Sequence, residues 1–224
     1  DSVISQFQLE PGFSILELWH GPTAAFKDVA LQIMPHILQI SKKKNNNSKH
    51  TAILVATSGD TGKAALEGFK NIEGISIMVF FPHEGVSELQ KLQMVTTDGS
   101  NTAVFAVKGN FDDCQTAVKK IFSDNTLEQI LSESNIELSS ANSINWGRLC
   151  PQIVYYVKSY MDLVQNKQIQ PGEYINFCVP TGNFGNILAA YYARAMGVPV
   201  KKLICASNKN HILPDFFAKG IYDS

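Results

Sequence analysis

Short runs of β-forming apolar residues alternate with segments of helical periodicity along this chain, and no other feature constrains its fold as strongly. The run Thr51–Ala56 leads into a polar loop and then into a helical pattern that ends near Phe69. The same kind of run returns at Ile75–Phe81, Thr102–Val107 and Tyr174–Val179. Strands that alternate with helices form parallel sheets covered by helices on both faces. The sequence therefore predicts an open α/β fold.

The remaining elements follow from the same patterns. An extended stretch is expected within Val3–Leu18, and Lys42–Ser48 is expected to be an exposed loop. Further helices are predicted at about Lys27–Ser41, Glu84–Met94, Asp112–Leu131, Gly147–Gln165 and Ile187–Met196, and further strands at Glu137–Ala141 and Lys202–Ala206. The polar segment Gln168–Gly172 is the best candidate for a domain boundary.

Composition excludes several classes of function. The 224 residues carry a formal net charge of −1, so no overall field attracts nucleic acid or an acidic membrane. No apolar run approaches the length of a membrane-spanning helix. The four cysteines lie far apart and form no metal-type pair: Cys114, Cys150, Cys178 and Cys205. A reducing, cytoplasmic setting and the absence of a metal site are therefore expected.

Lys27 is the candidate nucleophile. It follows the turn signal Gly21-Pro22 and stands near the start of a helix. The apolar positions of that helix are Val29, Ile33, Ile37 and Ile40. Partial burial and the positive end of a helix both disfavour the charged amine, which would lower its pKa and suit it to Schiff-base chemistry. The alternative is a surface lysine whose head group stays in water.

Two loops each connect a predicted strand to a predicted helix, where backbone N–H groups attract anions. Thr181–Asn186 contains two glycines and no acidic side chain, which suits a phosphate, although an ordinary turn with Asn183 as helix cap is the alternative. Thr57–Lys63 invites comparison with a P-loop and fails, because Ala64 stands at the Ser/Thr position and Thr57 at the first glycine position. In that loop Asp60 is also a candidate helix cap.

A polar cluster lies just before the helix predicted from Gly147, formed by Asn142, Ser143, Asn145 and Arg148. The planar guanidinium of Arg148 suits a phosphate because it donates two parallel hydrogen bonds. A surface ion pair is the alternative for the same residue.

Four segments, in this order along the chain, resemble the threonine synthase family. They are Leu16–Asp28, Ala56–Gly62, Asn142–Arg148 and Val179–Asn186. Together they span nearly the whole chain. The resemblance implies a fold type II pyridoxal-phosphate enzyme, similar in architecture to the β subunit of tryptophan synthase. Such an enzyme would convert O-phospho-L-homoserine and water to L-threonine and phosphate.

The resemblance also implies roles for single residues. Lys27 would hold pyridoxal 5′-phosphate as a Schiff base and move protons during the reaction. The loop of Gly182, Asn183, Phe184, Gly185 and Asn186 would hold the cofactor phosphate, and Asp60 would lie beside the cofactor, although many relatives have asparagine there. The substrate would contact Thr57, Ser58, Gly59, Thr61, Asn142, Ser143, Asn145 and Arg148.

Two lobes are expected from the resemblance, with residues 1–50 and 171–224 in the larger and residues 51–170 in the smaller. The chain starts without methionine and is about half as long as members of the family, which predicts a truncated piece. Two alternatives stay open: a phospho-lyase that releases 2-oxobutyrate from the same substrate, and a non-catalytic fragment. Self-association is possible, and neither nucleic acid nor membrane is expected as a partner.

Overall fold

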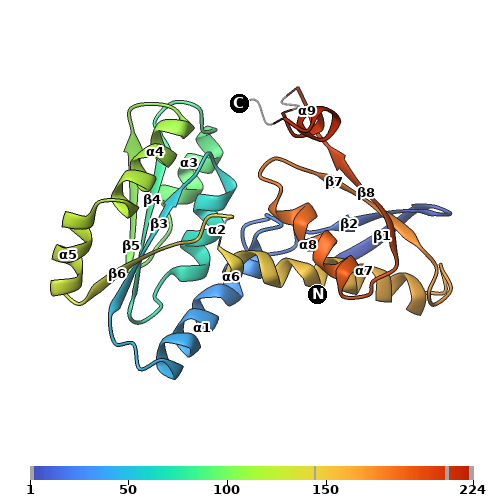
Figure 1. The fold of residues 1–224 in the computed structure, drawn as a ribbon, viewed down its shortest axis with the longest axis horizontal. Coiled ribbons are helices and arrows are strands. Elements are labelled where there is room, and N and C mark those ends of the chain that lie inside the picture. Colours follow the sequence, from blue (N-terminus) through green and yellow to red (C-terminus); the bar gives the residue numbers. More distant parts are fainter. Residues whose placement is uncertain (1–2, 144, 210–211, 222–224) are drawn as a thin grey trace. The chain divides into compact units, whose positions relative to one another are not determined.

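The computed structural model describes residues 3–143, 145–209 and 212–221, which fold into two compact units (Figure 1). Unit 1 comprises residues 1–5 and 17–151, and unit 2 comprises residues 6–16 and 152–224. This division differs from the expected one, which placed residues 1–50 with the C-terminal part of the chain. Residues 17–50 belong to unit 1 because their helix packs on the sheet of that unit.

Unit 1 is built on a four-stranded sheet. Its strands are β3 (His50–Ala56), β4 (Ile75–Pro82), β5 (Thr102–Val107) and β6 (Ile136–Ser140). They lie in the order β5-β4-β3-β6, and every neighbouring pair is parallel. The strand bounds agree with the predicted ones to within a residue, so the expectation of a parallel α/β sheet is confirmed.

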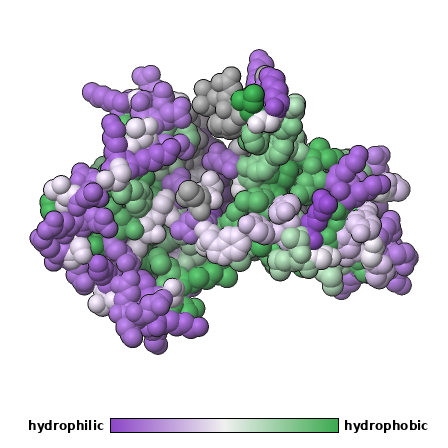
Figure 2. Space-filling view, viewed as in Figure 1, coloured by the Kyte–Doolittle hydropathy of each residue, from purple (hydrophilic) through white to green (hydrophobic). Residues whose placement is uncertain are grey.

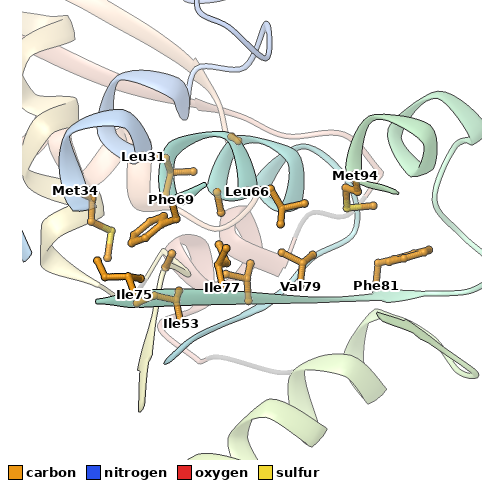
Figure 3. Close-up of a cluster of buried hydrophobic side chains, with 14 residues drawn as sticks. Leu31, Met34, Ile53, Leu66, Phe69, Ile75, Ile77, Val79, Phe81 and Met94 are labelled. Atoms are coloured by element: carbon orange, nitrogen blue, oxygen red, sulfur yellow. The ribbon is translucent and has the colours of Figure 1, made fainter. Parts of the chain in front are cut away.

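Helices cover both faces of this sheet. On one face, α1 (Asp28–Lys44), α2 (Asp60–Phe69) and α3 (Glu88–Val95) contribute Leu31, Phe69 and Met94 to the main core. Figure 3 shows these side chains pointing toward Ile75, Ile77, Val79 and Phe81 of β4. On the other face, α4 (Phe111–Phe122) packs Cys114 and Val118 into a second core.

Strand β3 shows how the sequence separates these two cores. Ile53 and Val55 belong to the main core, while Leu54 and Ala56 belong to the second. Successive strand residues point to opposite faces of a sheet, so a strand covered on both faces reads as a continuous apolar run. Thr51–Ala56 has that composition, and all of its residues are buried.

The helix predicted from the apolar spacing after Lys27 is confirmed as α1, but most of the residues that mark that spacing do not face the core. Ile33, Ile37 and Ile40 are 45%, 44% and 58% exposed, whereas Leu31 and Met34 are buried. The helix carries two apolar stripes, and spacing alone does not say which of them packs inward. Hydrophobic side chains accordingly reach the surface of the molecule, as the green areas of Figure 2 illustrate.

The expected loop at Lys42–Ser48 is shorter than predicted, because α1 continues to Lys44. Lys42 turns back into the unit, where its Nζ donates to Thr51 Oγ1 at 2.6 Å and lies 3.5 Å from Glu137 Oε1. Asn47 Nδ2 donates to the same carboxylate at 2.9 Å. Lys42 and Asn47 thus tie the end of α1 to the sheet.

Local caps explain the other differences in helix bounds. The single helix expected at Asp112–Leu131 is two helices, because Asp124 accepts from two backbone N–H groups and caps α5 (Asn125–Glu133). Asn110 caps α4 through a capping box with Asp113, so this helix begins at Phe111. Ser87 caps α3, which therefore begins at Glu88.

Unit 2 contains two small sheets. Strands β1 (Ser5–Glu10) and β2 (Phe13–Glu17) form one, and the parallel strands β7 (Ile175–Pro180) and β8 (Val200–Ala206) form the other. α8 (Gly185–Ala195) connects β7 to β8 and packs on α7 (Ile153–Gln165). The helix predicted from Gly147 begins instead as α6 (Trp146–Leu149) and a 3₁₀ turn at Cys150–Gln152. A further helix, α9 (Ile212–Lys219), was not predicted.

None of the helices in residues 3–143, 145–209 and 212–221 has the length and apolar composition needed to span a membrane. The same ranges hold no group of three His, Cys, Asp or Glu residues placed to bind a metal ion.

Candidate active site

Lys27 lies immediately before α1, and its side chain is 12% exposed. Its Nζ is 3.4 Å from Asp60 Oδ2 and 4.3 Å from the centroid of the Phe26 ring. Burial lowers the pKa of Lys27 below its usual value; Asp60 opposes that shift and nearby Arg148 reinforces it. A shielded amine with a lowered pKa is the state that favours nucleophilic attack on a carbonyl group.

Asp28 shapes the turn before Lys27, a role that the sequence reasoning missed. Its carboxylate is buried and accepts hydrogen bonds from the backbone N–H groups of Thr23 at 2.9 Å and Ala25 at 3.3 Å. The Thr23 hydroxyl also donates to it. A side chain at Gly21 would collide with Asp28, so glycine is needed for this close approach. The position of Asp28 directly after Lys27 was the feature of the sequence that could have indicated this role.

The Thr57 side chain organises the loop between β3 and α2. It is buried, and its hydroxyl oxygen accepts from the N–H groups of Gly59 and Gly62, each at 3.0 Å. Gly59 has φ +152°, a backbone angle that favours glycine. Thr57 was predicted to contact substrate, but its hydroxyl is used to hold the loop. Ser58 is exposed at the tip of this loop.

Asp60 is the first residue of α2 and not its cap, because Gly59 holds the cap position without a side-chain hydrogen bond. The capping alternative for Asp60 is therefore wrong. One carboxylate oxygen pairs with Lys27, and the other accepts from Gln90 Nε2 at 2.6 Å. Gln90 lies on α3, far from both residues in sequence, and no motif marked it.

Most side chains of the polar cluster before α6 form hydrogen bonds to the protein backbone. Asn142 Nδ2 donates to Ala56 O at 2.9 Å, and Asn145 caps α6 by accepting from Gly147 N at 2.8 Å. Ser143 is partly exposed, and Ile144 of the matched segment lies outside the described residues. The two asparagines thereby join the end of β6 to β3 and to α6.

Arg148 is 4% exposed and reaches toward the same loop as Lys27. Its NH1 donates to Ala141 O at 2.9 Å and its NH2 to Thr61 Oγ1 at 3.4 Å. The guanidinium therefore fixes α6 against the start of α2. The surface ion pair considered for Arg148 is wrong, because the residue is buried.

The glycine loop lies in unit 2, before α8. Phe184 holds the helix cap position in a left-handed conformation, φ +61°, and makes no side-chain cap, so the alternative of Asn183 as cap is wrong. An added side-chain carbon at Gly182 would meet open space. The N-terminal N–H groups of α8 consequently lack a capping side chain from the cap residue, as an anion site requires.

Two residues that no sequence motif marked, Tyr156 and Gln152, hold the side chain of Asn186. Tyr156 donates its hydroxyl to Asn186 Oδ1 at 2.6 Å, and Asn186 Nδ2 donates to Gln152 Oε1 at 2.9 Å. Burial raises the pKa of Tyr156, so its hydroxyl stays protonated and remains a donor. These bonds fix the first turn of α8.

The structure thus brings one set of predicted residues together in unit 1: Lys27, Thr57, Ser58, Gly59, Asp60, Thr61 and Arg148, with Asn142, Ser143 and Asn145 in the same unit. The glycine loop of residues 182–186 belongs to unit 2.

Comparisons with known proteins identify relatives of this chain. The chain is 51% identical to human threonine synthase-like 1 over 215 residues, which is 93% of this chain and 28% of that protein. It is 44% identical to threonine synthase of Pseudomonas aeruginosa over 223 residues, 100% of this chain and 45% of the enzyme. The chain therefore spans less than half the length of these relatives. No protein-family profile matches it.

A solved structure gives the same result. The structure of threonine synthase from Brucella melitensis with bound pyridoxal phosphate superposes with a TM-score of 0.85 at 41% identity, over 99% of this chain and 45% of that one. More distant neighbours at 13–17% identity, among them a cystathionine β-synthase from Helicobacter pylori, share the fold. By sequence and by fold, this chain is homologous to the threonine synthases and has the fold type II architecture.

Proposed function

We propose that this chain binds pyridoxal 5′-phosphate through Lys27 and serves the conversion of O-phospho-L-homoserine and water to L-threonine and phosphate. The observation that carries the proposal is the Lys27 amine itself. It is 12% exposed, stands in a loop that Asp28 holds rigid, and faces the carboxylate of Asp60 at 3.4 Å. The homology to threonine synthases supports the substrate class.

The residues of each unit, taken by itself, suit one end of the cofactor. An amine with a burial-lowered pKa suits a bond to its aldehyde carbon. The open space at Gly182 and the N–H groups at the start of α8 suit its dianionic phosphate. When bound, pyridoxal phosphate supplies an electron sink for proton removal next to the substrate amine.

The residues of unit 1 would position the substrate and move protons. Lys27, once released from the cofactor, would carry protons at its Nζ, and Asp60 would stabilise the charged form of that amine. Ser58 is exposed at the loop tip, and together with the first N–H groups of α2 it would receive the substrate carboxylate. Thr57, Asn142 and Asn145 would act by holding these loops in place.

Borohydride trapping tests the proposal. We expect the protein incubated with pyridoxal phosphate to gain one phosphopyridoxyl group after reduction, and peptide mass mapping to place it on Lys27. Supplied with O-phospho-L-homoserine, the protein should form threonine and phosphate in equal amounts. An adduct spread over exposed lysines would contradict cofactor binding, and formation of 2-oxobutyrate in place of threonine would identify the phospho-lyase instead.

Gly185→Val tests the phosphate cradle. A branched side chain at the first residue of α8 would obstruct the approach of a phosphate to the N–H groups there. We expect the affinity for pyridoxal phosphate to fall at least about tenfold, because a charged hydrogen bond contributes about 1.5–3 kcal/mol. Absorbance titration measures the affinity. Unchanged binding, with unchanged thermal unfolding, would exclude the loop as the phosphate site.

Arg148→Lys tests whether this residue serves the substrate. If Arg148 binds the phosphate of the substrate, lysine keeps the charge but cannot donate the two parallel hydrogen bonds of a guanidinium. We expect kcat/KM for O-phospho-L-homoserine to fall about ten- to a hundredfold, as the loss of one charged hydrogen bond implies. The absorbance of bound pyridoxal phosphate should not change. Normal activity, or loss of the cofactor instead, would contradict a role toward the substrate.

A further inference from the structure

Gln90 connects α3 to the candidate nucleophile through Asp60. Its Nε2 donates to Asp60 Oδ1 at 2.6 Å, while Oδ2 of the same carboxylate lies 3.4 Å from Lys27 Nζ. One oxygen is therefore held by an amide and the other faces the amine. Because a carboxylate is planar, fixing one oxygen also restricts where the second can lie.

The Gln90 side chain is held by Ser87 and has room for its amide beside Gly59. Ser87 accepts from Gln90 N at 3.2 Å and donates to Gln90 Oε1 at 3.1 Å. The bond to Oε1 turns the NH₂ group of the amide toward Asp60. On the other side, an added carbon at Gly59 would lie 2.5 Å from Gln90 Nε2, so the absence of a side chain there makes room for the amide.

Few charges act on the Lys27 amine. Asp60 at the start of α2 favours its charged form, and Asp28 at the start of α1 does so more weakly. Arg148 on α6 disfavours it, as does burial. Asp28 already accepts bonds from Thr23 and Ala25, so Asp60 is the carboxylate with an oxygen directed at the amine.

We propose that Gln90 is a positioning residue that directs the Asp60 carboxylate at Lys27 and thereby sets the fraction of the amine that is charged. The inference deepens the proposed function, since Lys27 is the nucleophile proposed there. Its test, however, measures the amine without cofactor or substrate, so the two can fail separately.

The pH dependence of Lys27 acetylation measures this fraction directly. Acetic anhydride reacts with neutral amines, so the yield at Lys27 between about pH 7 and 11, read by peptide mass mapping, gives the midpoint of its titration. Low ionic strength is required, because Asp60 is 53% exposed and salt would screen the pair. Gln90→Ala should lower the midpoint by about half a pH unit, and Asp60→Asn by about one.

A double-mutant cycle separates positioning from helix packing. If Gln90 acts through Asp60, Gln90→Ala should cause no further shift once Asp60→Asn is present. Gln93→Ala makes the same substitution one turn later on α3 and should leave the midpoint unchanged. An unchanged midpoint in Gln90→Ala would overturn the proposal. So would an equal shift in both backgrounds, which would show that Gln90 acts only by holding α3.

The two proposals have distinguishable failures. A shifted midpoint in a protein that gains no phosphopyridoxyl group would leave the role of Gln90 standing and refute cofactor binding by Lys27. A normal adduct on Lys27 with an unshifted midpoint in Gln90→Ala would support cofactor binding and refute the role of Gln90.

Discussion

Lys27→Ala is expected to abolish the borohydride-stable adduct with pyridoxal phosphate and to lower threonine formation by at least about a thousandfold. Burial lowers the pKa of Lys27, which suits this amine to attack on the aldehyde carbon. The substitution should spare the fold, because the partner Asp60 is 53% exposed and can be solvated once its cation is removed. Mass mapping of the reduced protein and a threonine assay measure the two effects.

Lys63→Ala is the matched control. Lys63 also belongs to unit 1, and its Nζ lies in an ion pair 3.0 Å from Glu67. Pyridoxal phosphate reacts weakly with many lysines, so the control shows what a lysine outside the candidate site contributes. Its adduct yield should equal that of the unchanged protein. An adduct of undiminished yield in Lys27→Ala, mapped to another lysine, would refute the assignment.

Strand β3 was predictable because all of Thr51–Ala56 is buried, and a strand covered on both faces is a compact apolar run that a surface helix does not have. The run Ile75–Phe81 of β4 is similar, although it contains Ser76. The loops that follow β3 and β7 were predictable for a related reason. Each joins the carboxyl end of a strand to a helix and contains glycines, one of which, Gly59, requires its unusual backbone angle.

Long-range hydrogen bonds were not predictable from the sequence. Gln90 and Asp60 are 30 residues apart, and Tyr156 and Asn186 are also 30 residues apart, with nothing local to pair them. Asn142 is a further case, since its side chain donates to Ala56 O, 86 residues away. Thr57 was assigned to substrate for a different reason: a hydroxyl suits that role, but the structure shows it bonded to the backbone of its own loop. Residue type indicates what a side chain can do, and packing decides which partner it meets.

The buried face of α1 depends on one glycine. An added side-chain carbon at Gly68, on α2, would lie 2.7 Å from the carbonyl carbon of Leu31 and still closer to its oxygen. These are backbone atoms, which cannot rotate away as a side chain does. The close approach at Gly68 therefore places Leu31 against α2 and leaves the stripe of Ile33 and Ile37 exposed. The close approach of α2 at Gly68 cannot be predicted from the spacing of apolar residues in α1.

Gly68→Ala is consequently expected to lower the free energy of unfolding of unit 1 by about 3 kcal/mol, which is at the upper end of the usual cost of overpacking a core. The sign of the change is diagnostic. In a helix without a clash, alanine in place of glycine would stabilise by about 1 kcal/mol. Urea unfolding followed by the fluorescence of Trp19 and Trp146, both in unit 1, measures the effect on that unit.

Ser41→Ala on the exposed side of α1 is the control for helix propensity, and its stability should equal or slightly exceed that of the unchanged protein. A Gly68→Ala protein as stable as the control would mean that α1 and α2 can separate without cost. The contact of Leu31 with α2 would then not be what selects the buried face of α1.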